Sequence, residues 1–381
     1  MVDLVGVKTF KVRLYPTANQ RGSLEGQLRS CARLYNALLE QRRIAWKSHR
    51  LTLSEYDQCE QIPDVVQHLP EYQAVYSQVL RDVCTRVDLA YQAFFRRCRS
   101  GETPGYPRFR AASRYDSLTY RQPGNGSVRV QTNHVTLSKL CTNLRFIPKP
   151  AIRGRVRIVT VRRQADRWFL CVTCDQVPPT IVAGSNEVGL DLGLTTLAVL
   201  SDGSTVENPR YAKRASAKLA AAQRRVARSQ KGSHRRRKLI LLLQKHHLKV
   251  VDQRRYAFHK AARRIVEANR FIAVERLAPS VMSRTPLPGF AKSFHDASWA
   301  LFLSILRRKA EDAGARVVEV DPRGTTQECS GCGTVVPKGL AVRVHTCPHC
   351  GLVLGRDLNA AHNILRRARL EPSLMTPLGV A

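Results

Sequence analysis

Four cysteines near the C-terminus have the spacing of metal ligands. They form two Cys-x-x-Cys pairs, Cys329 with Cys332 and Cys347 with Cys350, and a glycine follows each pair. In such a knuckle two thiolates converge on one ion while the glycine lets the chain turn back, and tetrahedral Zn²⁺ takes four ligands. Free core cysteines are scattered rather than paired at this spacing. The sequence therefore predicts one structural Zn²⁺ site in preference to four unrelated buried thiols.

Three acidic residues stand where an apolar pattern breaks. Asp191 lies in VGLDLG, where a period of two places it on the same strand face as two glycines. We expect this carboxylate to have an open surround, suited to a metal and a bulky substrate. Glu275 ends the apolar run FIAVE, and Asp357 opens the helical segment RDLNAAHNIL just after the second cysteine pair. Taken singly, each acid is typical of a strand end or a helix cap, but together they are suited to a carboxylate cluster.

The order of these motifs resembles a known nuclease family. VGLDLGLTTLAV, FIAVERL, a four-cysteine ribbon and GRDLNAAHNIL follow one another as in the TnpB family of transposon-encoded RNA-guided endonucleases, which type V CRISPR effector nucleases also resemble. The N-terminal stretches KVRLYP and GYPRF are similar to motifs of the same family. The resemblance covers nearly the whole chain, and it implies an RNase H-like (RuvC) nuclease domain with an inserted zinc ribbon.

The resemblance also implies roles for the three acids. Asp191, Glu275 and Asp357 match the catalytic carboxylates of the family and would hold Mg²⁺, as two ions, with Mn²⁺ able to substitute. Hard oxygen ligands suit Mg²⁺, and two ions about 3.5–4 Å apart act on both the attacking and the leaving oxygen of a phosphodiester. Asp191 is the expected bridging ligand because it lies in the middle of a sheet. The residues expected to orient or neutralise the scissile phosphate are Arg343, Arg356 and Asn359.

Two departures from the family pattern concern the segments around this site. The loop 325–328, TTQE, has a threonine where the family usually has a serine. Residues 137–150 match the family's barrel poorly. The second departure leaves the nucleic-acid contacts of that segment open, whereas the three acids are unaffected.

The composition favours a nucleic-acid partner and argues against a membrane or secreted protein. The 381 residues include 63 Lys and Arg against 29 Asp and Glu, a formal charge of +34. This excess predicts a polyanion bound through counterion release rather than a merely solvated basic surface. No apolar run approaches a membrane span and the first residues lack a signal sequence. Since eleven cysteines also favour a reducing compartment, we expect a cytoplasmic protein of a bacterium or archaeon.

The chain is predicted to be a multidomain α/β protein with a β-barrel and a helical bundle. Residues 1–18 and 105–180 alternate like strands, and the resemblance implies one wedge-type barrel. Residues 19–104 have apolar residues at three- and four-residue steps, which predicts a helical bundle, either the family's recognition domain or a plain packing module. The remaining segments are a RuvC-like domain over 185–322 and 352–370, the zinc ribbon over 323–351 and a C-terminal tail over 371–381.

Within the nuclease half, residues 187–201 and 204–208 are predicted as two consecutive strands joined by a turn at 202–203. Residues 278–291 are rich in proline and are expected to form a loop that acts as a lid. A helix is predicted over 296–313.

Residues 211–269 are helical and very basic, and the break at 229–233 predicts a hairpin of two helices. Basic helices are often only solvated faces, but this density of charge beside a nuclease-like sheet favours a phosphate track. The candidate phosphate contacts are Arg224, Arg225, Arg235, Arg236 and Arg237. The candidates for reading a short duplex motif next to the target are Ser77, Gln78 and Arg81, with barrel residues around 117–121.

The implied partners are a guide RNA encoded next to the gene and double-stranded target DNA with a short adjacent motif, while the oligomeric state stays open. Two other functions compete with RNA-guided cleavage: an RNA-guided DNA-binding regulator that does not cut, and a DNA transposition accessory protein. The intact set of three acids argues against the regulator, which has no need of all three. A chain that performs strand transfer itself would need a tyrosine or serine nucleophile motif, and none stands out.

Overall fold

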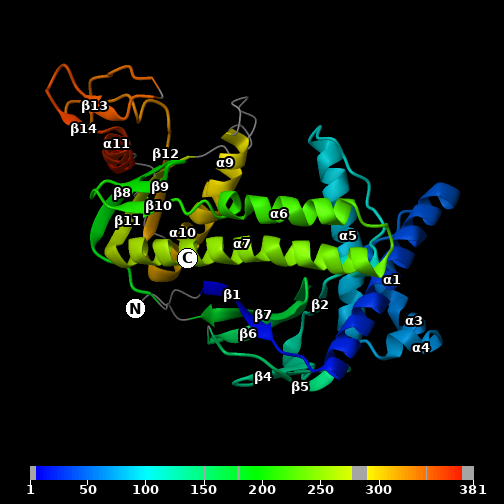
Figure 1. Ribbon diagram of the computed structural model, residues 1–381. Coiled ribbons are helices and arrows are strands. Elements are labelled where there is room, and N and C mark those ends of the chain that lie inside the picture. The colour runs from blue at the N-terminus through cyan, green and yellow to red at the C-terminus, as the bar shows by residue number, and fades with distance from the viewer. Residues whose placement is uncertain (1–5, 150, 178–180, 277–289, 340, 371–381) are drawn as a thin grey trace. The chain divides into compact units, whose positions relative to one another are not determined.

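The computed structural model describes residues 6–149, 151–177, 181–276, 290–339 and 341–370. The chain divides into two compact units, Met1–Pro178 and Pro179–Ala381, which are described one at a time (Figure 1). Within the described residues no helix has the length and apolar character needed to cross a membrane. The predicted tail, 371–381, and most of the predicted lid loop, 278–291, lie outside the described residues.

The first unit contains two antiparallel sheets. In spatial order their strands are β1 (Gly6–Leu14), β7 (Arg167–Val177), β6 (Arg155–Gln164) and β2 (Ser117–Tyr120) in one sheet, and β3 (Val128–Val130), β4 (His134–Leu137) and β5 (Cys141–Arg145) in the other. The sheets meet where Leu14 bridges Phe146. The first strand therefore joins the β6–β7 hairpin as predicted, while β5 lies in the segment that matched the family least.

Between β1 and β2 the chain forms the predicted helical bundle. Its helices are α1 (Ala18–His49), α2 (Glu55–Glu60), α3 (Ile62–His68), α4 (Pro70–Gln73) and α5 (Ser77–Arg99), and short 3₁₀ turns follow at Ala112–Arg114 and Pro123–Asn125. A capping box at Thr17 and Gln20 starts α1. The leucines of α1 and the valines of α5 share one core with both sheets. The bundle is thus packed onto the strands as part of one unit.

The second unit is built on a five-stranded sheet in the order β10-β9-β8-β11-β12. The strands are β8 (Asn186–Leu192), β9 (Thr196–Leu200), β10 (Thr205–Glu207), β11 (Asn269–Glu275) and β12 (Arg316–Val320). β8, β9 and β10 are antiparallel, whereas β8, β11 and β12 run parallel. The prediction of one strand over 187–201 is wrong, because the chain reverses between β8 and β9. A Cβ on Gly193 would lie 2.8 Å from the carbonyl oxygen of Thr196, so this turn requires glycine.

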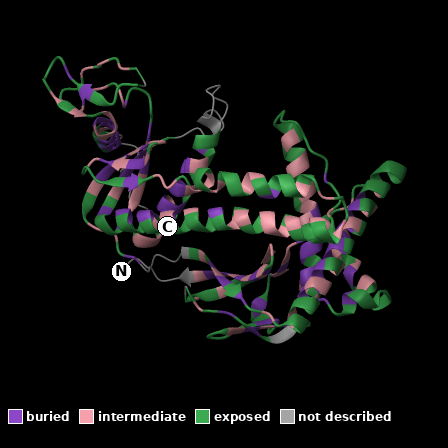
Figure 2. Cartoon of the chain, in the orientation of Figure 1, coloured by how far each residue is buried: buried purple, intermediate pink, exposed green. Residues whose placement is uncertain are grey.

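Helices cover both faces of this sheet. They are α7 (His234–Ala268), α9 (Phe290–Ala297), α10 (Trp299–Ala313) and α11 (Arg356–Leu370), while α6 (Tyr211–Ala227) packs against α7. α7 and α10 share a core with one face of the sheet and α11 packs on the other (Figure 1). Figure 2 shows buried residues in the strands of this sheet and in the helices packed on it, α11 among them. The predicted hairpin is α6–α7, but the helix expected over 296–313 begins only at Trp299, because Ser298 takes a left-handed φ of 50°.

A small two-stranded ribbon is inserted between β12 and α11. Its strands are β13 (Val344–Thr346) and β14 (Val353–Gly355), which pair antiparallel. β14 leads directly into Arg356, the first residue of α11. The inserted element therefore ends where the acidic start of the last helix begins.

Candidate active site and metal centre

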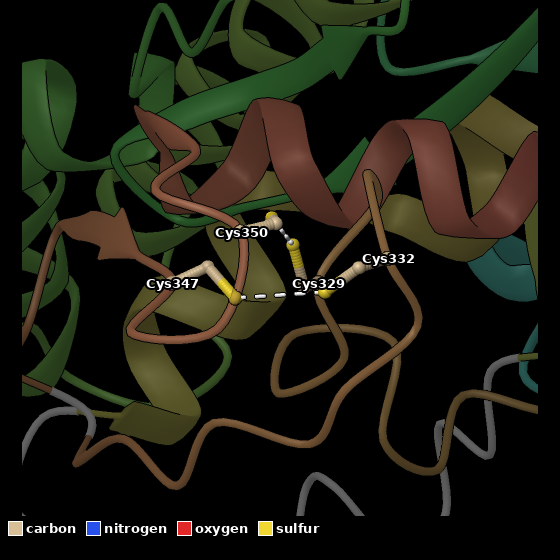
Figure 3. A group of neighbouring side chains, drawn as sticks. All are labelled: Cys329, Cys332, Cys347 and Cys350. Carbon is tan, nitrogen blue, oxygen red and sulfur yellow. Dashed lines mark hydrogen bonds between the residues drawn. The ribbon is translucent and has the colours of Figure 1, made fainter.

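The four cysteines come together in the inserted ribbon (Figure 3). Their Sγ atoms all lie within 4.8 Å of one another, and the pairs Cys329–Cys350 and Cys332–Cys347 are each 3.6 Å apart. This separation is far longer than a disulfide bond of about 2.05 Å. Tetrahedral ligands at a Zn–S distance of about 2.3 Å would be separated by about 3.8 Å. The cluster thus has the dimensions of a Zn²⁺ site, as predicted.

Each knuckle closes on a glycine with positive φ. Gly333 has a φ of 79° and donates its N–H to the carbonyl of Cys329 over 2.9 Å. Gly351 has a φ of 72° and donates in the same way to Cys347 over 3.0 Å. L-residues with a Cβ rarely take this conformation. The two glycines are therefore what allows each pair of thiols to face one ion.

Buried asparagines join the ribbon to α11. The side chain of Asn359 accepts from the N–H of Ser330 over 2.9 Å and donates to the carbonyl of Glu328 over 2.7 Å. Asn363 donates to the carbonyls of Thr325 and Glu328 over 2.9 and 2.7 Å. Both side chains are fully buried. The expected contact between Asn359 and a scissile phosphate is therefore wrong, because its amide already holds the ribbon against the helix.

The three acids come from three elements that meet at one place. Asp191 and Glu275 each lie one residue beyond the last paired positions of the parallel strands β8 and β11, Leu190 with Val274. Asp357 lies in the first turn of α11. α11 covers the face of the sheet on which Gly189 lies, and strand alternation places Asp191 on that same face. The sheet and the helix thus bring the carboxylates to one end of one face.

The surround of Asp191 is not open in the way that the sequence suggested. A Cβ on Gly189 would lie 2.1 Å from the carbonyl oxygen of Ala361. This glycine therefore lets the backbone of α11 lie directly on β8 and leaves no room there for a substrate. The close approach of α11 is also what carries Asp357 toward Asp191.

The three carboxylates are half-buried and lie in one electrostatically crowded site. Burial, and then the charges of Glu275 and Asp357, raise the pKa of Asp191 to about 8, against the opposing effect of Arg356. Burial also raises the pKa of Glu275. The site therefore disfavours the negative charge of Asp191 as long as no further cation lies beside it. A divalent cation with oxygen ligands would compensate it, so the three acids fit a Mg²⁺ or Mn²⁺ site.

Two neighbours orient the acids. The buried hydroxyl of Thr325 donates to Oε1 of Glu275 over 2.6 Å, which favours the charged form of this carboxylate. Arg356 donates from Nε to Oδ1 of Asp357 over 3.1 Å and from Nη1 to the carbonyl of Val342. Arg343 has an exposed side chain, and its carbonyl accepts the N–H of Arg356. Thr325 was not predicted as a site residue, and the threonine at an atypical place in loop 325–328 was the only hint.

Most of the arginines predicted to contact phosphates are exposed, but one is half-buried and held by hydrogen bonds within the protein. Four of them have exposed side chains on the α6–α7 hairpin: Arg224, Arg225, Arg235 and Arg237. Arg236 is half-buried, and its Nη1 donates to the carbonyls of Val226 and Ser229 over 2.5 and 2.8 Å. Through this atom the guanidinium of Arg236 caps the end of α6 and closes the turn of the hairpin. Arg237 donates to the carbonyl of Gly232 over 3.2 Å, and the phosphate contacts of all five arginines stay a prediction.

The candidates for reading a duplex motif lie on α5 and β2. Ser77 and Arg81 are exposed, and Gln78 donates to the side chain of Gln122 over 3.3 Å. The hydroxyls of Ser117 and Thr119 accept from Arg86 of α5. Since the hydroxyls of Ser117 and Thr119 hold β2 against α5, the exposed side chains of α5 are the better placed of the two sets for an external contact.

Three family models match separate parts of the chain. Residues 169–285 match a model described as "Probable transposase", residues 299–364 a Cas12f1-like TNB domain, and residues 7–50 a helix-turn-helix domain. In the structure the last of these segments contains β1 and the single helix α1. The TNB match contains the four-cysteine ribbon and most of α11.

Comparison with individual proteins agrees with these matches. The chain is 31% identical to a "Putative RNA-guided DNA endonuclease" of Streptomyces pristinaespiralis, over 94% of this chain and 88% of the relative. It is 28% identical to "Putative RNA-guided DNA endonuclease InsQ" of Escherichia coli strain K12, over 76% of this chain and 74% of that protein. Its fold is similar to a chain in the cryo-EM structure of a Cas12f1–sgRNA–target DNA complex, with a TM-score of 0.57, 12% identity and coverage of 97% and 99% of the two chains.

Proposed function

This chain belongs to the TnpB family of RNA-guided DNA endonucleases, and we propose that it is a transposon-associated nuclease that cuts target DNA selected by a guide RNA. The observation that carries the proposal is the meeting of Asp191, Glu275 and Asp357 at one end of one face of the sheet, where burial and then the charges of the other two acids raise the pKa of Asp191 to about 8. A DNA-binding regulator has no need of such a site, because assembling buried like charges costs stability unless a bound cation repays it.

The five-stranded sheet with its helices is proposed to be the RuvC-like domain, over 185–322 and 352–370. The order β10-β9-β8-β11-β12, with an antiparallel meander followed by two parallel strands, supports this assignment. The two sheets of the first unit would form the wedge-type barrel, over 1–18 and 105–180, and residues 19–104 the recognition bundle. The ribbon over 323–351 would hold one structural Zn²⁺ through its four cysteines.

The chain's own residues prepare the site for phosphodiester hydrolysis. Asp191, Glu275 and Asp357 would hold Mg²⁺ or Mn²⁺, two ions in all. Bound there, such ions activate water and stabilise the leaving oxygen. Asp191 lies on β8, the central strand of the sheet, and would be one of these metal ligands. Thr325 orients the carboxylate of Glu275, and Arg356 that of Asp357.

We propose that the target DNA is recognised in two ways, by base pairing with the guide RNA and by contacts with the protein. Guide pairing with the target strand would supply the sequence, and the exposed residues Ser77 and Arg81 of α5, with the half-buried Gln78, would contact a short duplex motif beside the target. The exposed arginines of the α6–α7 hairpin would bind phosphates. The guide RNA is expected from DNA next to the gene, and the protein is expected to act on DNA in the cytoplasm of its host.

Alanine substitutions at the three acids test this function. We expect Asp191→Ala, Glu275→Ala and Asp357→Ala each to lower the cleavage rate by on the order of 10³-fold or more, since each removes a ligand from a site that works as a unit. Binding to the guided target should stay within about twofold of the parent. The measurement is cleavage and binding of a labelled target by complexes that carry the co-purified RNA, in Mg²⁺ and in Ca²⁺, which should support binding with little cutting.

Glu207→Ala is the matched control, because Glu207 is an exposed carboxylate on β10 of the same sheet. It should cut at the parent's rate. An Asp191→Ala protein that cuts within a few-fold of the parent would contradict the assignment of the site. A parent complex that binds its guided target in Mg²⁺ without cutting would identify an RNA-guided regulator instead.

A further inference from the structure

A cleft in the first unit lies between α1, the segment that follows α4 and the turn joining β4 to β5. Its volume is about 350 Å³, within the range of pockets that bury a small ligand. The side of α1 that faces it is made of small residues: Ser23, Gly26 and Ser30. None of the residues assigned above to cleavage, zinc binding or motif reading lines this cleft.

Gln27, one of the residues that line the cleft, has a buried acceptor without a partner. Gln27 has only 5% of its surface exposed, and its Nε2 donates to the carbonyls of Ala74 and Lys139 over 2.6 and 2.7 Å. These two bonds use both N–H groups and so fix which end of the amide is the oxygen. Oε1 is buried and has no hydrogen-bond partner. Because a buried acceptor is rarely left unsatisfied, Oε1 calls for a donor from outside the chain.

A glycine of α1 leaves room in the cleft for such a donor. Gly22 and Gly26 lie one turn apart inside a helix of 32 residues, where glycine is less favourable than alanine. No atom lies within 4 Å of a Cβ built on Gly22, and the nearest to one built on Gly26 is Nη2 of Arg29, at 3.9 Å. Packing within the chain therefore does not require glycine here. Of the two, only Gly26 lines the cleft, beside Gln27.

The rim of the cleft is cationic. It carries Arg29, Arg33 and Lys139 against one acid, Glu71. Arg33 pairs with Glu71 over 2.5 Å, and Lys139 donates to the carbonyl of Gln73 over 3.1 Å. The rim therefore keeps two positive charges in excess, which suits a phosphate. A ligand that fills this cleft would combine an anion with a neutral hydrogen-bond donor.

We propose that the cleft binds one nucleotide of the guide RNA, with its phosphate on the cationic rim and its ribose 2′-hydroxyl donating to Oε1 of Gln27. Every ribonucleotide carries both groups, whereas a deoxyribonucleotide lacks the hydroxyl. The site would thus favour RNA over DNA at one position without reading a base. This inference rests on the proposed function, which supplies the RNA.

A pair of glycine variants tests the cleft. Gly26→Leu should place a side chain in the cleft, whereas Gly22→Leu, one turn earlier on the exposed helix, serves as the control. Both should keep or raise the melting temperature, because leucine has the higher helix propensity. With the RNA that co-purifies with the parent, transcribed in vitro, we expect a loss of affinity of about tenfold for Gly26→Leu and less than twofold for Gly22→Leu.

Acylation of 2′-hydroxyls along the same RNA supplies a second readout. One nucleotide should be protected in the parent and Gly22→Leu complexes and reactive in the Gly26→Leu complex. Replacing that nucleotide with its 2′-deoxy form should weaken binding to the parent but not to Gly26→Leu. A parent that binds RNA and cuts its target, with both variants equal to it in affinity and acylation pattern, would overturn the inference alone. A parent that retains no RNA would overturn the proposed function as well.

Discussion

At the residue scale, the environment of Asp191 suits a metal ligand but lowers the stability of the folded protein when no metal is bound. A carboxyl in an unfolded chain titrates near pH 4, whereas burial and its acidic neighbours raise the pKa of Asp191 to about 8. The folded state therefore binds a proton more tightly than the unfolded state. Its stability contribution is fully present below about pH 4 and is lost as the pH rises toward 8. Without metal, the site thus lowers the stability of the folded protein at neutral pH, and a bound cation would remove this cost.

Replacing Asp191 with asparagine should expose this cost. In buffer without Mg²⁺ and without chelator, so that zinc stays bound, we expect Asp191→Asn to melt several degrees above the parent at pH 8.5. The difference should shrink toward pH 5. We expect the difference in unfolding free energy at pH 8.5 to be about 1–3 kcal/mol in favour of Asp191→Asn.

Thermal melts across this pH range measure the effect, and the exposed acid Glu207 again provides the control, as Glu207→Gln. Added Mg²⁺ should raise the melting temperature of the parent more than that of Asp191→Asn, and more at pH 8.5 than at pH 5. Parallel melting curves for parent and Asp191→Asn at every pH would show that no unpaired charge is buried there.

The three acids could be singled out from sequence because each one interrupts a local pattern: Asp191 lies in an alternating strand, Glu275 ends an apolar run and Asp357 opens a helix. The roles of Thr325 and Asn359 could not. The bond from Thr325 to Glu275 spans 50 residues, and those from Asn359 to the ribbon span 29 and 31. Such contacts exist only once the sheet, ribbon and helix are assembled. Gly189 was interpreted as open space for the same reason, since nothing in its strand shows that α11 lies on it.

At the scale of elements, the ribbon and α11 depend on each other. The ribbon has little core of its own, and its buried contacts with the helix run through the backbone near Thr325, Glu328 and Ser330. Ion pairs from Arg366 and Arg367 to Glu328 add to this junction. A cluster of thiolates that closes only around an ion would therefore stabilise the start of the helix that carries Asp357.

Loss of one cysteine ligand should accordingly loosen α11 as well as the ribbon. We expect the parent to contain one Zn²⁺ per chain and Cys347→Ser to contain much less than one. In Cys347→Ser, amide hydrogen exchange should be about tenfold or more faster over 323–354 and over the first turns of α11, with cleavage strongly reduced. Cys98→Ser is the control, since Cys98 is exposed on α5 of the other unit. If amide exchange in α11 of Cys347→Ser stays at the parent's rate, zinc binding does not stabilise the helix that carries Asp357.

Elements with strong periodicity were predicted well, and those defined by a single backbone conformation were not. The α6–α7 hairpin and the long helices α1 and α5 follow from apolar spacing and a polar break. The reversal between β8 and β9 was missed because VGLDLGLTTLAVL is an almost continuous buried run, in which a Gly-Leu-Thr turn gives a weak signal. The start of α10 depends on one left-handed residue, Ser298, which residue type alone does not predict.

At the scale of the whole molecule, the fold has to stay stable although the positive charges that sum to +34 repel one another. The α6–α7 hairpin shows how this is done. At one end the buried carboxylate of Asp296 accepts from the N–H groups of Ala212 and Lys213 and pairs with Arg254 over 2.9 Å. At the other end Arg236 caps α6. With both ends fixed, the exposed arginines between them are held ready for phosphates.

The salt dependence of RNA binding should measure how many of these charges contact phosphate. Each neutralised phosphate of a single strand contributes about 0.7 to the slope of log affinity against log salt concentration. Replacing Arg224, Arg225, Arg235 and Arg237 together with alanine should therefore lower the slope by up to about 3, with the largest loss of affinity at low salt. The same four positions replaced with lysine form the matched control, because charge is kept while the forked hydrogen bonds are lost. This lysine variant should keep the slope and lose little affinity. If the alanine variant keeps the parent's slope for the co-purified RNA, the hairpin is only a solvated basic face, and the phosphates lie elsewhere on the protein.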